Sequence, residues 1–374
     1  MSALQIDGLG LVGGFGCGVG QLKAALKRGW VDPSLGAECN IGATHELPLY
    51  RANTSPLERY LNKRVLRRID HFSRLALLGA FQALEDAQTR QQAVLDKSRL
   101  GVVLCSGFGA LNTTFKFLDS VLDDGDSFAS PTAFSNSVHN AAAAHISMQL
   151  GISGPGLTLS QFDHSFAAGL LQAQQWLDER RVDAVLLGVV DEYSSVLGYC
   201  WERLLGVDTD TRMCPFGSDV PTAIPGEGAA FFVLRPQQGI EQNIEQKMGQ
   251  SYATIQQVAS GNLRGSKPQL APDTPLILGC EGHPPTLAMY QEHIPVHTSV
   301  ACYTPLYGAS PVASGFDVAV AALALQGGEL SPSPGVAPSA NIPWSVVDTV
   351  APVNTLACVD FGVGGEYSVI QLQR

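Results

Sequence analysis

Apolar runs of strand length recur along this chain, and they constrain its fold more than any other feature. Segments 100–107 (LGVVLCSG), 182–190 (VDAVLLGVV) and 228–234 (GAAFFVL) are nearly free of charged residues, as is typical of strands buried on both faces. Segments 67–88 and 165–181 place apolar residues at helical spacing. This alternation of strands and helices predicts an α/β fold in which helices are layered on a buried sheet.

A change in composition indicates two halves. Residues 236–272 are polar and rich in proline and glycine, whereas an apolar run resumes at 276–282. We therefore place the boundary within the polar segment, which gives an N-terminal half of residues 1–240 and a shorter C-terminal half of residues 241–374. No sequence repeat relates the halves, although the pattern is compatible with a diverged structural duplication.

The charge balance excludes several classes of function. The chain of 374 residues has a formal net charge of −11, whereas a nucleic-acid-binding protein needs a basic surface. No apolar run reaches the roughly 18 residues of a membrane-spanning helix. The opening MSALQIDGLG lacks the features of a signal peptide, so we expect the protein in the cytoplasm. Only 15% of the residues are charged, as expected of a subunit with a large apolar interface.

The eight cysteines are scattered singly, without a CxxC pair. Zinc sites and disulfide frameworks need closer or more regular spacing. In a reducing cytoplasm we interpret most of these cysteines as small buried apolar residues. No metal or redox cofactor is expected.

Six segments, taken in order, resemble ketosynthases of the thiolase superfamily. They are IDGLGLVGGFGCG, RRIDHFSRLALLGAFQALEDA, GVVLCSGFGAL, SPTAFSNSVHNAAAAHISMQLGISGP, MCPFGSD followed by PGEGAAFFVL, and VDFGVGGEYSVI. Each motif alone has low specificity, but together they cover nearly the whole chain. The resemblance implies a thiolase-like fold, with two βαβαβαββ halves in an αβαβα layered arrangement.

The resemblance also implies where a nucleophile belongs. Ketosynthases place a cysteine on a tight strand-to-helix turn, where the helix N-terminus and nearby histidines favour the thiolate and bind the oxyanion. In GPGLTLSQFDHSFAAGLLQA this position is occupied by Asp163, and no cysteine lies within thirty residues on either side. A carboxylate cannot form the acyl thioester. The alternative is that Asp163 only caps the following helix.

The two family histidines are absent as well. The Gly-His-x-x-Gly-Ala motif is replaced by LYGASPVASG, which puts Gly308 and Ala309 at the histidine position. The His-Gly-Thr motif is replaced by CEGHPPT, where His283 is one position away from the family histidine. Neither Gly308 nor Ala309 can transfer a proton.

The segments SFAAGLL and YGASPVASGF resemble chain-length-factor-like proteins of bacterial polyene and aromatic polyketide systems. Those proteins are inactive sisters that pair with a catalytic ketosynthase. The resemblance therefore implies a non-condensing subunit of a heterodimer that shapes the acyl tunnel of its partner. The acyl and malonyl groups arrive on the phosphopantetheine arm of an acyl carrier protein, so the chain itself needs no cofactor.

Basic residues cluster in RYLNKRVLRRIDHFSR at 59–74, although the chain as a whole is acidic. Acyl carrier proteins are acidic, and a basic patch would attract them over a long range. We take Arg64, Arg67 and Arg68 as candidates for carrier docking. The alternative is a solvated helix face without a partner.

Two further sets of candidates follow from the resemblance. The segment GALNTTFKFLDS lies where the family builds its acyl tunnel, which makes Leu111, Thr114, Phe115 and Phe134 candidates for ending the tunnel. Ordinary core packing is the alternative. The glycines of FGVGG, which are Gly362, Gly364 and Gly365, are expected to let the backbone approach the former active site closely.

Other functions remain open at this point. The segment GLGLVG at 8–13 fits GxGxxG with Asp32 beyond it, which is a weak dinucleotide-binding signal. Ser160, Ser165 and His164 suggest a serine hydrolase, but GxSxG is absent.

Two alternatives keep the fold and change the role. One is a homodimeric enzyme with altered chemistry, such as decarboxylation or acyl transfer, that uses Asp163, His164 or His283. The other is a purely structural partner of a ketosynthase.

Overall fold

The computed structural model describes residues 2–37, 46–92, 94–204, 212–217, 221–237, 251–335 and 342–374, and every structural statement below concerns these residues. None of their helices combines the length and the apolar character needed to cross a bilayer.

One large sheet of twelve strands runs through the described residues, in the order β13-β11-β10-β15-β16-β9-β1-β8-β7-β5-β6, with β2 beside β1. Its N-terminal strands are β1 (Leu4–Gly13), β2 (Gly16–Cys17), β5 (Leu100–Ser106), β6 (Gly156–Ser160), β7 (Ala184–Asp191) and β8 (Gly228–Pro236). Its C-terminal strands are β9 (Thr254–Asn262), β10 (Leu276–Leu278), β11 (Ser299–Ala301), β13 (Ser345–Val346), β15 (Thr355–Phe361) and β16 (Glu366–Gln373). Two small sheets pair β3 (Ser34–Ala37) with β4 (Glu46–Leu49), and β12 (Glu329–Leu330) with β14 (Ala351–Pro352).

The two halves of the sheet repeat the same pairing pattern. In the first half, β1 and β8 are antiparallel, β8 and β7 are antiparallel, and β7, β5 and β6 are parallel. In the second half, β9 and β16, and then β16 and β15, are antiparallel, and β15, β10 and β11 are parallel. The halves join where the start of β1 pairs with the start of β9. This internal duplication confirms the predicted thiolase-like α/β fold. The boundary predicted between residues 240 and 241 lies outside the described residues.

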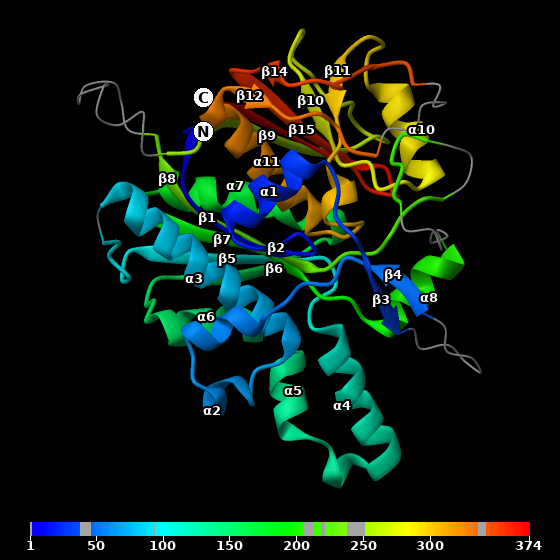
Figure 1. Ribbon diagram of the computed structural model, residues 1–374. Helices are drawn as coiled ribbons and strands as arrows, with labels where there is room; N and C mark the ends of the chain where they lie inside the picture. Colours follow the sequence, from blue (N-terminus) through cyan, green and yellow to red (C-terminus); the bar gives the residue numbers. More distant parts are fainter. Residues whose placement is uncertain are drawn as a thin grey trace.

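The helices form three layers around the two halves (Figure 1). They are α1 (Val19–Arg28), α2 (Lys63–Leu66), α3 (His71–Gln91), α4 (Leu111–Asp124), α5 (Pro131–Ser137), α6 (Ala141–Leu150), α7 (Ser165–Asp178), α8 (Ser195–Leu204), α10 (Pro284–His293) and α11 (Ala313–Gly327). Short 3-10 helices are η1 (Ser55–Arg59), η2 (Asp126–Phe128), η3 (Phe162–His164) and η4 (Thr304–Leu306). Helices α3 and α6 cover the outer face of the first half, and α10 covers that of the second.

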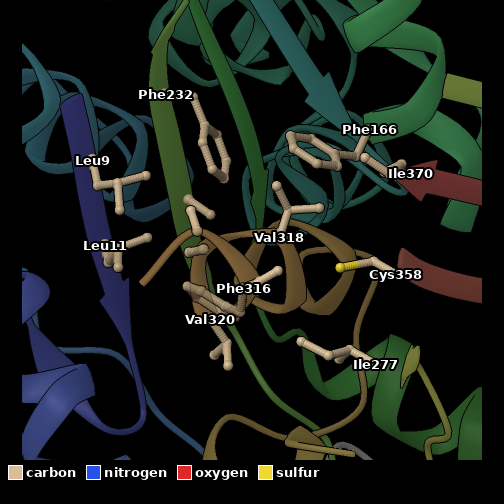
Figure 2. Close-up of a cluster of buried hydrophobic side chains, with 14 of the residues drawn as sticks. Leu9, Leu11, Phe166, Phe232, Ile277, Phe316, Val318, Val320, Cys358 and Ile370 are labelled. Atoms are coloured by element: carbon tan, nitrogen blue, oxygen red, sulfur yellow. The ribbon is translucent and has the colours of Figure 1, made fainter. Parts of the chain in front are cut away.

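Helices α7 and α11 form the central layer, and one core encloses both (Figures 1 and 2). Phe166 of α7 packs against Phe232 of β8, with ring centroids 5.3 Å apart. Helix α11 is apolar along nearly its whole length, and its residues Val318 and Val320 point into the same core as Ile370 of β16. A helix that is apolar all round is buried on every side, which is why α11 occupies the centre of the molecule.

A hairpin formed by α4 and α5 projects from the body of the molecule (Figure 1). Phe117 and Phe134 hold the two helices together, with ring centroids 5.3 Å apart. The hairpin nevertheless exposes large apolar side chains, since Leu122 is 81% and Phe128 80% accessible. Such a concentration of exposed apolar groups is characteristic of an interaction surface.

Helix α3 packs closely against strand β1 because Gly10 of β1 has no side chain. A Cβ atom on Gly10 would lie 1.9 Å from the carbonyl oxygen of Gly79 and 2.6 Å from the backbone nitrogen of Ala83. Both neighbours are backbone atoms of one helix, so a side chain at residue 10 must push the whole helix away from the sheet.

We therefore expect Gly10→Ala to lower the free energy of unfolding by about 2–4 kcal/mol, measured by urea denaturation. The matched control is Gly20→Ala in α1, where an added Cβ meets nothing within 4 Å. That change should be neutral or stabilising by up to about 1 kcal/mol. Equal stability of the two variants would contradict this packing.

Candidate functional site: an acidic elbow between β6 and α7

Asp163 lies on a tight turn between β6 and α7. The chain leaves β6 at Ser160, passes Phe162 with a φ of +48°, and enters α7 through η3. A left-handed conformation is unusual for an aromatic residue and marks a sharp elbow. The Ser165 hydroxyl accepts a hydrogen bond from the backbone of Gln161 (2.8 Å) and lies 2.9 Å from the carbonyl oxygen of Ser106 at the end of β5. The elbow is thus tied to the sheet and presents Asp163 at its tip.

Asp163 does not occupy the capping position of α7. The N-cap of that helix is His164, whose side chain makes no capping hydrogen bond. The carboxylate of Asp163 instead interacts with its own backbone N–H. The Asp163 side chain can therefore interact with groups around the elbow instead of capping helix α7.

The loop between β15 and β16 lies against the elbow. A Cβ atom on Gly362 would lie 3.1 Å from Oε2 of Glu366, 3.4 Å from Oδ2 of Asp163 and 3.5 Å from Nε2 of His164. Three polar atoms from two separate segments thus surround one glycine. The loop is held by a hydrogen bond from the backbone of Gly362 to the carbonyl oxygen of Glu366 (3.0 Å), and Gly365 has a φ of +82°. Gly364 lies between them, and an added Cβ there would meet the Glu366 carboxylate at 2.6 Å.

Further carboxyl groups, at or just after the ends of three strands, lie near Asp163. Asp191 ends β7, Asp360 lies near the end of β15, and Glu281 follows β10. Asp360 accepts a hydrogen bond from the Tyr290 hydroxyl (3.2 Å), and the carboxylate of Glu281 interacts with the backbone N–H of Ser310. Strands β7 and β15 are equivalent in the two halves. The duplication therefore places Asp191 and Asp360 at corresponding positions near the carboxyl ends of these strands.

Burial and mutual repulsion make these carboxyl groups weak acids. Burial, with the charge of Glu366 second, raises the pKa of Asp163 to about 6. Burial raises the pKa of Asp191 to about 7, and burial together with the charge of Asp163 raises that of Asp360 to about 7. The same two causes raise the pKa of Glu281 well above its usual value. The charged groups that act most strongly on these four are themselves acidic.

His164 lies beside this cluster as a neutral ring. It is 7% exposed, and burial lowers its pKa despite the nearby Glu366. Neither ring nitrogen makes a well-formed hydrogen bond within the described residues. A backbone interaction with Glu366 also acts on the ring, which links His164 to the start of β16.

Gly308 and Ala309 lie on the turn from β11 to α11, which is equivalent to the Asp163 elbow in the other half. Ala309 donates a backbone hydrogen bond to Ile224 (2.8 Å), and Gly226 donates one to Ala309 (2.9 Å). Gly308 has a φ of +84°, and an added Cβ would lie 2.9 Å from Gly226 Cα. Both elbow tips of the duplicated fold thus carry groups that cannot act as a thiol or an imidazole.

The segment after β10 brings Glu281 near Asp163 and buries His283. His283 is buried at the N-cap of α10, where its carbonyl oxygen accepts a hydrogen bond from the Thr286 hydroxyl (2.9 Å). In this segment it is Glu281 whose pKa the charge of Asp163 raises, after the larger effect of burial. The sequence analysis missed Glu281 because it searched the segment for an imidazole. The sequence feature that could have identified Glu281 is a carboxylate placed between a buried strand and a helix.

The buried thiols of the chain are inert. Burial raises the pKa of Cys105, Cys280, Cys302 and Cys358 above the ordinary thiol value. A nucleophilic cysteine needs the opposite shift, produced by a neighbouring cation or a helix N-terminus. None of these four cysteines has the surroundings of a nucleophilic thiol.

Aromatic rings cover the elbow on its outer side. Phe162 packs edge-on against Phe108 (5.6 Å between centroids), and Phe108 packs in the same way against Trp201 of α8 (6.2 Å). Phe162 is nevertheless 65% exposed. These rings were not among the candidates from sequence, because they come from three separate segments.

The four tunnel candidates lie on the projecting hairpin. Leu111, Thr114 and Phe115 belong to α4 and are partly buried, and Thr114 bonds the Ala110 carbonyl oxygen (2.9 Å). Phe134 of α5 is 55% exposed. A side chain as exposed as Phe134 can end a tunnel only when another chain covers it.

The basic candidates line a surface groove. A groove of about 360 Å³ lies between α2 and α6, bounded by Arg64, Arg68, Ile69, His145 and Met148 among others. Arg67 is exposed beside it. Within the described residues no group of three or more histidine, cysteine or acidic side chains is arranged to hold a metal ion.

The raised pKa values give a testable pH dependence. The unfolded chain releases the Asp163 proton near pH 4 and the folded chain near pH 6, so folding stability falls as the pH rises through this window. We expect Asp163→Asn to be more stable than the wild type by about 1–2 kcal/mol at about pH 8, with the gain vanishing toward about pH 3.

Urea unfolding at the two pH values measures this difference, and Asp119→Asn on the exposed face of α4 serves as the control. A gain that is the same at both pH values would show that the carboxyl group of Asp163 is not held protonated by the fold.

Comparison with known proteins agrees with this architecture. The profile described as "Beta-ketoacyl synthase, N-terminal domain" matches residues 46–239. The chain is 25% identical over 184 residues to 3-oxoacyl-[acyl-carrier-protein] synthase 2 of Staphylococcus aureus, which covers 48% of this chain and 45% of that protein. The corresponding protein of Vibrio cholerae is 24% identical over 183 residues, with 47% and 44% covered. The match thus spans less than half the length of these relatives.

Solved structures match over the full length. A beta-ketoacyl synthase from Burkholderia phymatum has a TM-score of 0.80 at 14% identity, with both chains covered completely. The ishigamide ketosynthase/chain length factor has a TM-score of 0.77 at 17% identity, with 100% of this chain and 99% of that chain covered. At such low identity these likenesses show the fold alone. Because the family profile covers more than half of its residues, the chain belongs to the beta-ketoacyl synthase family.

Proposed function

We propose that this chain is a non-condensing subunit that pairs with a catalytic ketosynthase and shapes the acyl tunnel of the complex. The observation that carries the proposal is the side chain at the tip of the β6–α7 elbow, which is a carboxyl group instead of a thiol. A carboxyl group held at a raised pKa is a poor nucleophile and gives no thioester on which a chain could grow.

The equivalent elbow supports the same conclusion. Condensation needs a group that transfers protons or stabilises charge near the nucleophile. Ala309 at the tip of the β11–α11 turn has no such group, and burial, followed by the charge of Asp163, raises the pKa of the neighbouring Glu281 well above its usual value. The carboxyl groups around Asp163 therefore supply no positive charge that would favour a thiolate or a developing oxyanion.

The exposed edge of the sheet supports a partner subunit. Strand β6 is the last strand of the N-terminal half, and its outer edge is unpaired within the described residues. Exposed edges of this kind are normally covered or paired. The apolar hairpin of α4 and α5 follows β5, the neighbour of β6 in the sheet, and carries the exposed Leu122 and Phe128. A partner of the same fold would cover apolar surface and pair the sheet edge at once.

The likeness in fold to a ketosynthase/chain length factor and to a ketosynthase in complex with its acyl-carrier protein favours this class of partner. In such a pair the hairpin would meet the partner, and Phe115 and Phe134 would become part of a shared wall. The groove bounded by Arg64 and Arg68 would receive the acidic carrier protein, which brings the phosphopantetheine arm.

Association is the first test. Co-expressed with a ketosynthase of the same genome that retains its cysteine, the chain should elute as a one-to-one heterodimer in size-exclusion chromatography with light scattering. Leu122→Asp should weaken this complex at least about tenfold, because it puts a charge into the apolar interface.

Val94→Asp is the control, since Val94 is 78% exposed but lies away from the hairpin. A stable homodimer that ignores the ketosynthase would favour an independent enzyme and contradict the proposal.

Carrier docking is the second test. The double variant Arg64→Glu with Arg68→Glu should bind the acyl carrier protein of the same system at least about tenfold more weakly than the wild-type complex, with a larger loss at low salt. Lys267→Glu, on the exposed surface of the C-terminal half, should leave binding unchanged. A salt-independent affinity in all variants would show that the groove does not attract the carrier protein.

A further inference from the structure

We propose that a groove between helices α1 and α11 binds a short straight-chain carboxylate, with its charged end at Lys23 and Lys27 and its alkyl chain on the apolar side chains of α11. None of the described residues that line this groove belongs to the Asp163 elbow or to the hairpin of α4 and α5. The inference therefore stands or fails independently of the proposed partnership.

The groove lies on the surface where α1 packs over α11 (Figure 1). Helix α1 forms one side, α11 forms the floor, and β12 with the residues that follow it forms the other side. Its volume is about 380 Å³, which falls within the range of sites that hold small molecules. The groove is therefore large enough for a small organic ligand.

The floor of the groove is apolar. Val320, Leu323 and Ala324 of α11 line it, with exposed fractions of 1%, 7% and 7%. Leu26 of α1 lies beside them, and Val350, which is 58% exposed, also lines the groove. An alkyl chain placed here would remove apolar surface from water, which is the main source of affinity for such a group.

One side of the groove carries two cations. Lys23 and Lys27 are four residues apart on α1, so they lie on the same face of the helix, and both are exposed. Neither lysine forms an ion pair with a described residue, although the charge of Lys23 acts on Asp86 of α3. The two ammonium groups are thus able to share one anionic ligand.

The other side of the groove adds little negative charge. Glu329 of β12 is the acidic side chain among the residues that line it. A third cation lies near Glu329, because an added Cβ on the preceding Gly328 would lie 3.2 Å from Nη1 of Arg374. Cations therefore outnumber acidic groups at this groove, although the whole chain has a net charge of −11. The local charge favours an anion.

These features together select the class of ligand. An alkylammonium ion is repelled by the two lysines, and a small inorganic anion leaves the apolar floor uncovered. A straight-chain carboxylate places one negative charge between the lysines, where charge-assisted hydrogen bonds form, and lays its methylene groups on α11. A monoanion also limits the repulsion from Glu329.

The experiment is a calorimetric and thermal-unfolding titration of the full-length chain with sodium hexanoate at constant ionic strength. Hexanoate should bind one-to-one at millimolar concentrations and raise the unfolding midpoint. Acetate supplies the charge without the alkyl chain, and 1-hexanol supplies the chain without the charge. Each should bind at least about fivefold more weakly than hexanoate.

Two pairs of variants locate the site. Lys23→Gln combined with Lys27→Gln should bind hexanoate at least about fivefold more weakly, whereas Lys267→Gln should bind it as the wild type does. Val350→Asp should weaken binding to a similar extent, whereas Val296→Asp, at a residue 63% exposed outside the groove, should not. All the altered side chains are exposed, and the unfolding midpoint without ligand checks that each variant is folded.

Two results would overturn the proposal. One is the absence of saturable hexanoate binding to the wild-type chain. The other is hexanoate binding that neither the lysine changes nor Val350→Asp weakens, which would place the ligand elsewhere on the molecule. The wild-type titration needs no variant to fold, and neither result bears on whether the chain pairs with a ketosynthase.

Discussion

A carboxyl group confined at the tip of the β6–α7 elbow is the constraint on which the rest of this site depends. The elbow is fixed by the Ser165 hydroxyl and by the core around α7, so Asp163 has little freedom to turn toward bulk water. Burial raises the pKa of Asp163, and the neighbouring Glu366 carboxylate raises it further. Burial without a cation costs free energy at neutral pH, and a protein that tolerates such a cost commonly uses the group or has lost the ligand that balanced it.

The same electrostatics bear on the proposal that this chain does not condense acyl groups. A thiolate needs positive potential, whereas the ends of β7, β10 and β15 supply carboxyl groups whose pKa values are raised by burial.

The sequence was sufficient for the fold and for the place of Asp163. Continuous apolar runs such as 182–190 and 228–234 are buried strands, and the spacing between strand and helix put residue 163 on the turn. These properties are local, because the periodicity of a strand and the composition of a turn depend on consecutive residues.

The remaining features of the site depend on contacts between distant segments. Glu281, Asp360 and Glu366 meet Asp163 only because the two halves of the sheet share one central layer, and no local pattern encodes that meeting. Phe134 was a candidate for a tunnel wall, yet its exposure follows from how far the hairpin projects. Arg64 and Arg68 form a groove only with α6, which lies far along the chain.

The most direct test of the central claim is whether this polypeptide can carry an acyl chain. Intact-protein mass spectrometry of the purified chain, incubated alone with an acyl thioester donor, should show an unchanged mass. When the chain is incubated with the catalytic ketosynthase proposed as its partner, the acyl group should appear on that ketosynthase only. A stable acyl adduct on this chain, whatever residue carried it, would contradict the account.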